Sequence, residues 1–161
     1  MKKLLFLFVG CLLLVGCSAK ETFEVVDDDP MQHTPVMQKM ICLLPEDATA
    51  QTVQNEYGQL YFCDGYEITM QTFASGDLDK TLRELTGFGR NDLTVMQTGI
   101  TSPTRYECVW TAAGEGGDMV GRAAVLDDGK YHYCMTVMAT QSDAARLRDT
   151  WKNLFDSFTL G

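Results

Sequence analysis

Short strand-like stretches separated by turn residues constrain the fold of this chain more than any other feature. Asp64-Gly65 and Asp128-Gly129 each separate two such stretches, and both dipeptides suit tight hairpin turns because they tolerate positive φ. The glycine-rich run 114–117 supplies residues for a further chain reversal and predicts a flexible hairpin loop. The pattern predicts an antiparallel sheet of about six or seven strands. The expected strands are 40–44, 59–63, 66–73, 93–98, 104–112, 119–126 and 131–139.

Two other stretches have helical periodicity. Leucines at i, i+4 and i+7 predict a helix over 77–86, with Asp77 as its N-cap and Gly87 at its end. A second helix is predicted over 142–158, with Ser142 as its N-cap. Its apolar side is formed by Leu147, Trp151, Leu154, Phe155 and Phe158. A sheet with two helices gives the α+β class.

The N-terminus has the three-part layout of an export signal. Two lysines follow Met1, an apolar run covers 4–15, and small residues follow it. The apolar run is well short of the ~20 residues that a helix needs to cross a bilayer, and it fits the ~7 to 15 residues of a signal core. Residues 1–16 are therefore predicted to be a cleaved signal peptide and not a membrane-spanning helix.

The end of this segment, Leu14-Val15-Gly16-Cys17, resembles the lipobox of bacterial lipoproteins. The resemblance implies cleavage between Gly16 and Cys17 and acylation of Cys17, which then anchors the chain to the outside of a bacterial membrane. Gly10-Cys11 is the poorer cleavage site because Phe8 replaces the leucine and the apolar core would be shorter. Cys11 is therefore expected to leave with the signal.

The mature chain is acidic. Loss of Lys2 and Lys3 with the signal reduces the 13 basic residues to 11, against 22 acidic ones. Without a basic cluster, nucleic acid and anionic headgroups are poor partners, so membrane attachment is assigned to acyl chains on Cys17. Residues 17–36 are predicted to be a lipidated N-terminus and flexible tether, and 37–161 a single globular domain.

Four cysteines remain for the exported domain: Cys42, Cys63, Cys108 and Cys134. An even count allows disulfides in three pairings, or buried thiols that pack as small apolar residues. A two-residue loop at 128–129 places Cys134 opposite Ala123, with Cys108 on the other side of that middle strand. Such a separation exceeds the reach of a disulfide. We favour a Cys42–Cys63 disulfide because these two residues lie on strands that are near in sequence, and we predict that Cys108 and Cys134 are buried thiols.

No catalytic motif is present in the sequence, and no metal or cofactor site is predicted from it. His33 falls in the tether, and His132 is expected to be a structural or surface histidine. The wide cysteine spacing argues against zinc. Methionines could bind copper through their thioethers, but they are dispersed, and the four in strand-like stretches are expected to fill the core. These four are Met70, Met96, Met135 and Met138.

Two pairs of aromatic residues fall on shared strand faces. Tyr106 lies on the same face as Trp110, and Tyr131 on the same face as Tyr133. Both pairs suit a core, and a recognition surface is the alternative.

The order of elements resembles that of the PsbP-like α/β/α sandwich, to which bacterial lipoproteins of the DcrB type are similar. The resemblance covers 41–158 and rests on a strand running into Leu43-Leu44-Pro45, a hairpin, a helix, the sheet and a closing helix that ends at 151–158. It implies an accessory or binding protein and not an enzyme. The expected function is an interaction module of the cell envelope with an unidentified envelope protein as partner. The alternative is a small-ligand or substrate-binding lipoprotein.

Overall fold

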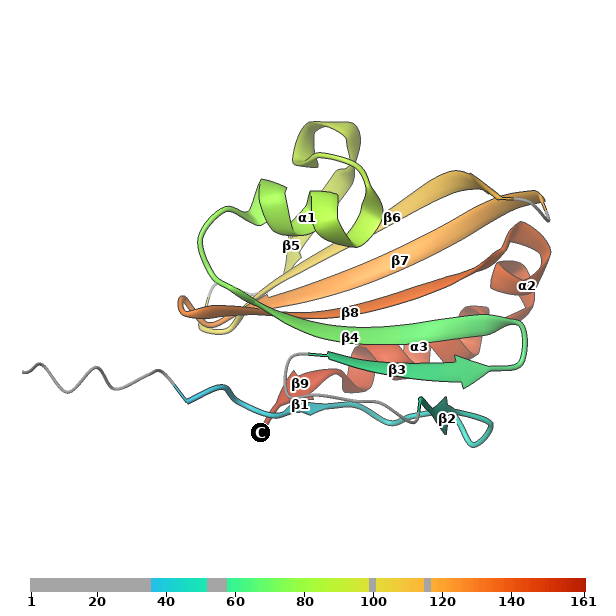
Figure 1. Cartoon of the computed structure of the whole chain (residues 1–161), viewed down its shortest axis with the longest axis horizontal. Coiled ribbons are helices and arrows are strands. Elements are labelled where there is room, and N and C mark those ends of the chain that lie inside the picture. The colour runs from blue at the N-terminus through green and yellow to red at the C-terminus, as the bar shows by residue number, and fades with distance from the viewer. Residues whose placement is uncertain (1–35, 52–57, 99–100, 115–116) are drawn as a thin grey trace, which may run out of the picture. The chain divides into compact units, whose positions relative to one another are not determined.

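A seven-stranded antiparallel sheet forms the centre of the protein (Figure 1). The computed structural model describes residues 36–51, 58–98, 101–114 and 117–161, which fall in the folded unit Pro35–Gly161. The strands follow the order β2-β3-β4-β8-β7-β6-β5. They are β2 (Thr49–Ala50), β3 (Gly58–Cys63), β4 (Tyr66–Ala74), β5 (Thr94–Thr98), β6 (Thr104–Gly114), β7 (Gly117–Asp127) and β8 (Tyr131–Thr140). A separate pair joins β1 (Met40–Ile41) to β9 (Thr159–Leu160).

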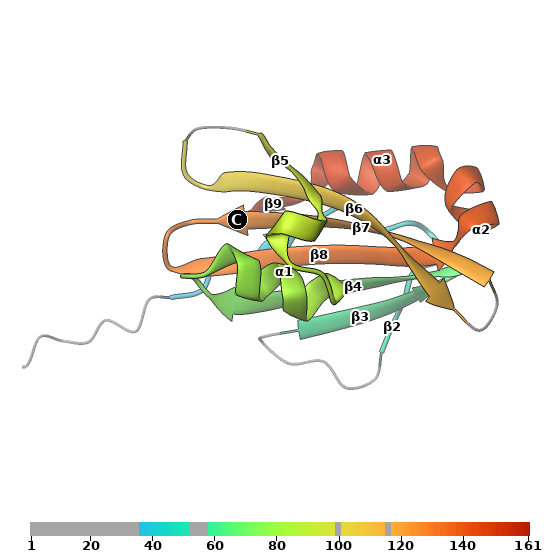
Figure 2. The same ribbon diagram turned by 90° about the horizontal axis from the view of Figure 1, so that it is seen from above.

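Helices lie on both faces of the sheet (Figures 1 and 2). One face carries α1 (Leu78–Thr86), which is followed by the short 3-10 helix η1 (Arg90–Asp92). The other face carries α2 (Gln141–Arg146) and α3 (Arg148–Ser157). This arrangement confirms the predicted α+β class with its antiparallel sheet. No helix in the described residues is long and apolar enough to span a membrane.

The predicted signal and tether lie outside the described residues. This applies to Gly16 and Cys17 and to the tether up to residue 35. The anchoring of the chain therefore stays a prediction.

The first helix has the predicted caps. A carboxylate oxygen of Asp77 accepts a hydrogen bond from the Asp79 backbone N–H at 2.9 Å. Gly87 ends the helix in the left-handed region at φ 79°, and its N–H bonds the Arg83 carbonyl. Both features are determined by neighbouring residues, which explains why the sequence predicted them.

The second predicted helix is wrong in two details. Its N-cap is Thr140 and not Ser142, because β8 runs directly into the helix and Thr140 Oγ1 accepts the Asp143 N–H at 3.2 Å. The helix is also interrupted at Leu147, whose buried side chain packs in the core. Leu147, at φ −87° and ψ 6°, lies between α2 and α3.

Two strand predictions also need correction. The expected strand 40–44 is only Met40–Ile41, because the Leu43 N–H bonds Ser157 Oγ at 2.9 Å and not a neighbouring strand. The turn between β7 and β8 is centred one residue later than predicted: the Asp128 N–H bonds the Tyr131 carbonyl, which leaves Gly129-Lys130 as the loop. Cys134 therefore lies opposite Val125 and not Ala123.

The core has two unequal layers. The larger layer lies between the sheet and the helices α2 and α3, and its buried members include Phe155, Trp151 and Tyr133. The smaller layer lies under α1 and contains Leu82, Cys108, Trp110, Ala123, Val125 and Cys134. The face that carries α1 is therefore the less completely covered one.

Candidate functional site

Helix α1 covers only part of its face of the sheet. The helix has nine residues and is about 14 Å long, whereas β6 and β7 have eleven residues each and extend for about 36 Å. The end of the face near the β3–β4 and β6–β7 hairpins has no helix over it among the described residues (Figure 2). We call this region the open sheet face, formed by Phe62, Glu67, Trp110, Met119, Gly121 and Met138.

A row of directly opposite residues crosses five strands of the open sheet face. Phe62 pairs with Glu67, which pairs with Met138 on β8. Met138 pairs with Gly121 on β7, and Gly121 pairs with Trp110 on β6. Paired residues of antiparallel strands point to the same side, so this row is one continuous strip.

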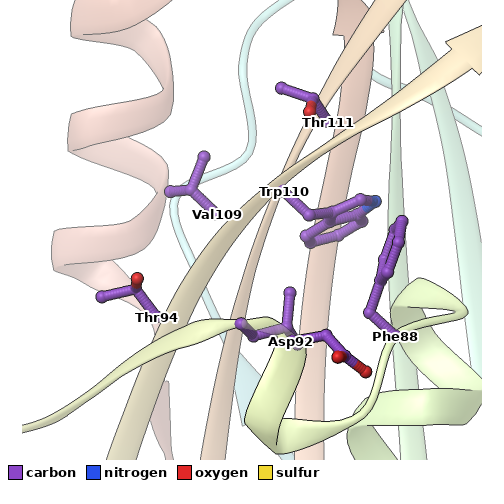
Figure 3. A pocket seen from close by; sticks show the side chains of 7 residues that line it. Phe88, Asp92, Thr94, Val109, Trp110 and Thr111 are labelled. Atoms are coloured by element: carbon purple, nitrogen blue, oxygen red, sulfur yellow. The ribbon is translucent and has the colours of Figure 1, made fainter.

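Trp110 closes one end of the strip and lies over Gly121. A Cβ atom at Gly121 would come within 2.2 Å of the Trp110 ring, so the indole occupies the space above this glycine. Phe88, from the segment after α1, approaches the same indole (Figure 3). Trp110 therefore marks the boundary between the covered and open parts of the face. The sequence interpretation of Trp110 as a core residue agrees with its 5% exposure.

The other end of the strip exposes large apolar side chains. Phe62 is 46% exposed and Met138 is 38% exposed, although both belong to the central sheet. A hollow of about 360 Å³ lies beside them and is also lined by Met119. A second hollow of about 330 Å³ is lined by Phe88, Asp92 and Trp110 (Figure 3). Large apolar patches mark binding sites, and these exposed side chains make this region the candidate one.

The charged side chains that line these two hollows are acidic. Glu67 lies in the strip itself, and Asp92 lines the hollow beside Trp110. Among the described residues, neither hollow is lined by a lysine or an arginine. The local charge therefore has the same sign as the net charge of −9. A complementary surface would carry apolar side chains together with lysine or arginine.

His132 holds α1 on the sheet. It is 1% exposed, and its Nδ1 lies 2.8 Å from Thr81 Oγ1 on α1. Its Nε2 lies 3.4 Å from Ser75 Oγ, which donates to Asp127 Oδ1 at 3.0 Å. Both ring nitrogens therefore face polar partners inside the fold, and this confirms the structural interpretation of His132. The other histidine, His33, lies outside the described residues.

All four described cysteines are free thiols. The favoured Cys42–Cys63 disulfide is not formed, because Cys42 contacts Met70, which lies opposite Gln59 on β3. Cys63 is four residues beyond Gln59 on β3, about 13 Å along that strand, whereas a disulfide requires Cα atoms within ~7 Å. The sequence placed both cysteines on neighbouring strands and could not determine where along those strands they lie.

Cys108 and Cys134 are buried thiols, as predicted. Burial raises the pKa of Cys108 to about 11 and also raises the pKa of Cys134. Both thiols are therefore protonated and unreactive at neutral pH. Cys108 pairs with Ala123 on β7, and Cys134 pairs with Val125 on the same strand. The strand β7 therefore lies between the two cysteines.

The methionines follow the prediction only in part. Met70 and Met135 are buried in the core, whereas Met96 is 55% exposed and Met138 belongs to the open sheet face. The sequence therefore missed Phe62, Glu67 and Met138 as candidate functional residues. Alternation along the strands could have placed them on one side of the sheet. Only the position of α1 shows that the open sheet face is uncovered.

The sequence matches no family model. It also matches no curated protein. Solved structures of similar fold include the following three. A protein of Bacteroides thetaiotaomicron has a TM-score of 0.51 and 8% identity, covering 76% of this chain and 45% of its own length. The Ran-binding protein Mog1p of Saccharomyces cerevisiae has a TM-score of 0.48 and 10% identity, covering 77% of this chain and 95% of its own.

The third structure is LpqN, involved in cell envelope biogenesis of Mycobacterium tuberculosis. It has a TM-score of 0.47 and 12% identity, covering 80% of this chain and 87% of its own. This chain spans less than half the length of the Bacteroides protein. The Bacteroides protein shares the fold over the matched region, and the other two similarities are weaker.

Proposed function

We propose that this chain is a lipid-anchored protein of the bacterial cell envelope whose domain binds another envelope protein and catalyses no reaction. One observation carries the binding role: the open sheet face exposes Phe62 and Met138 beside Glu67 in a continuous strip. The resemblance of the sequence layout to PsbP-like and DcrB-like domains agrees with an accessory role. The anchor in this proposal is the acylated Cys17, on the outer side of the membrane.

The chemistry of the expected partner follows from the same face. Its centre is apolar and its lining charges are acidic, so the matching surface combines apolar side chains with lysine or arginine. A protein partner fits better than a small ligand, because hollows of about 330 and 360 Å³ are at the small end of the ~300 to 1,000 Å³ typical of ligand sites.

Replacing Phe62 and Met138 together with serine is expected to reduce recovery of the partner at least about tenfold. Two exposed apolar side chains at the centre of an interface commonly contribute more than ~1.4 kcal/mol together. The measurement is affinity purification from detergent-solubilised membranes, with a photoreactive residue at position 67 to crosslink the partner before lysis. Quantitative mass spectrometry then compares wild type and variant.

Leu43→Ser is the matched control, because Leu43 is 74% exposed and lies outside the open sheet face. It should leave partner recovery unchanged. Equal losses for this control and the double variant would contradict a specific role of the face. Thermal unfolding of each variant separates lost binding from lost folding.

The anchor is tested independently. Cys17→Ala is expected to abolish acylation, so the chain should retain its signal and lose the mobility shift of the mature lipoprotein on a gel. Globomycin, which blocks the lipoprotein signal peptidase, should cause the unprocessed but acylated form to accumulate. Unchanged processing and mobility in both experiments would contradict the anchor and leave the binding role of the open sheet face untouched.

A further inference from the structure

Three sulfur-containing side chains line one hollow on the opposite side of the sheet from α1. The hollow has a volume of about 410 Å³ and lies between the N-terminal segment of the domain and the strands β3 and β4. Its sulfur-containing residues are Met40, Cys42 and Met70. The thiol of Cys42 donates to the thioether of Met70, with the two sulfur atoms 3.9 Å apart.

The local structure explains how these side chains meet. Met40 begins β1, and Cys42 directly follows the end of this two-residue strand. Both are partly buried and pack against the core that contains Met70, whereas Ile41 between them is 45% exposed. Pairing of β1 with β9 holds this segment beside the sheet. Residues 30 positions apart in the sequence are thereby brought to one hollow.

We propose that Met40, Cys42 and Met70 form a binding site for a single soft monovalent metal ion, Cu(I). Thiolate and thioether ligands are soft and select Cu(I) over hard divalent cations. The dispersed methionines of the sequence gave no sign of such a site, because its ligands converge only in the folded chain.

The distance between the two sulfur atoms fits a shared ion. With metal–sulfur bonds of about 2.3 Å, sulfur atoms 3.9 Å apart subtend an angle of about 116° at the ion. This angle is close to trigonal and leaves one position for a third ligand. Met40 lines the same hollow with a flexible side chain and can supply that ligand.

Binding is an exchange of a proton for the metal ion. The Cys42 sulfur forms a bond to Cu(I) as its S–H bond breaks, and the proton passes to solvent. The two thioethers donate lone pairs, and no atom changes oxidation state.

The test is an anaerobic titration of the purified full-length chain with Cu(I) against bicinchoninate, a chromophoric competitor. Wild type should bind one Cu(I) that Cys42→Ser binds at least about 100-fold more weakly, because the thiolate is lost. Met70→Leu and Met40→Leu should each weaken binding about tenfold. Leucine is close to methionine in volume, so both variants should remain folded.

Matched controls carry the same substitutions away from the hollow. Cys63→Ser changes a partly buried thiol at the far end of β3, and Met96→Leu changes an exposed methionine on β5. Both should bind Cu(I) like wild type. X-ray absorption of the loaded protein should show three sulfur neighbours in wild type and two in Met40→Leu.

Two results would overturn the proposal. They are equal Cu(I) affinity in wild type and Cys42→Ser, and an equal loss in Cys63→Ser. Ag(I), which has the same charge and no accessible second oxidation state under these conditions, should compete for the site. Failure of Ag(I) to compete would also contradict it.

Discussion

Replacing Gly121 with alanine is expected to lower the free energy of unfolding by about 3 kcal/mol. The added Cβ would come within 2.2 to 2.8 Å of three ring atoms of Trp110. The indole is 5% exposed and packs near Phe88, so it has little room to move. Urea unfolding followed by tryptophan fluorescence and circular dichroism measures the loss.

Gly89→Ala is the matched control for this substitution. Its Cβ would meet the end of the flexible Arg83 side chain, which is 56% exposed and can move away. We expect a loss of less than about 1 kcal/mol there. In a Trp110→Leu background the cost of Gly121→Ala should fall below about 1 kcal/mol, because the overlapping ring is gone. The same cost in both backgrounds would exclude the indole as the cause.

The second large effect concerns an ion-pair network on the side of the sheet that carries α3. Glu107 bonds Arg105 Nε at 2.7 Å through one oxygen and Arg122 at 2.8 Å through the other. Arg105 also donates to the carbonyls of Phe155 and Phe158 at the end of α3, at 2.8 and 3.0 Å. Arg122 lies 4.1 Å from the centre of the Phe155 ring. Glu107 therefore holds two arginines that fasten α3 to the sheet.

Glu107→Gln is expected to lower the free energy of unfolding by about 2 kcal/mol at pH 7. The neutral amide keeps the shape of the side chain but leaves two partly buried guanidinium groups without their counter-ion. Glu84→Gln is the control, because Glu84 is exposed on α1, and it should cost less than about 0.5 kcal/mol. Urea unfolding at pH 7 measures both losses.

The loss caused by Glu107→Gln should depend on pH. Burial acts to raise the pKa of Glu107, but hydrogen bonds from Arg122 and Arg105 outweigh it and hold the pKa below its usual value. A carboxyl group whose pKa is lowered by folding stabilises the folded state. This stabilisation is complete above the pKa of the unfolded state, about 4.3, and is lost as the pH falls through the pKa of the folded state. The difference between wild type and variant should therefore be constant from pH 7 to about 5 and shrink in stronger acid. A difference that grew on acidification would contradict this assignment.

The local elements of the fold could be predicted because their signals lie in neighbouring residues. Asp64-Gly65 makes the turn between β3 and β4, and Asp77 and Gly87 cap α1. One prediction failed because a distant contact replaced the local one. The segment after Ile41 bonds Ser157 in place of extending its strand.

The candidate sites depended even more strongly on distant contacts. Strand alternation assigns Phe62 and Met138 to one side of the sheet, but α1 decides which part of that side is covered. Cysteine spacing suggested a Cys42–Cys63 pair, whereas the path of the N-terminal segment brings Cys42 to Met70. Neither the position of α1 over the sheet nor the approach of Cys42 to Met70 can be read from a local sequence pattern.

The sequence by itself determined the class of the fold, the hairpins and the caps of α1, because backbone preferences and strand periodicity act over a few residues. It also carries the signal on which the lipid anchor at Cys17 is proposed. The tertiary structure alone decided which half of the α1 face is open and which sulfur atoms share a hollow. Both depend on how helices and strands dock, and docking is set by the packing of side chains far apart in the chain.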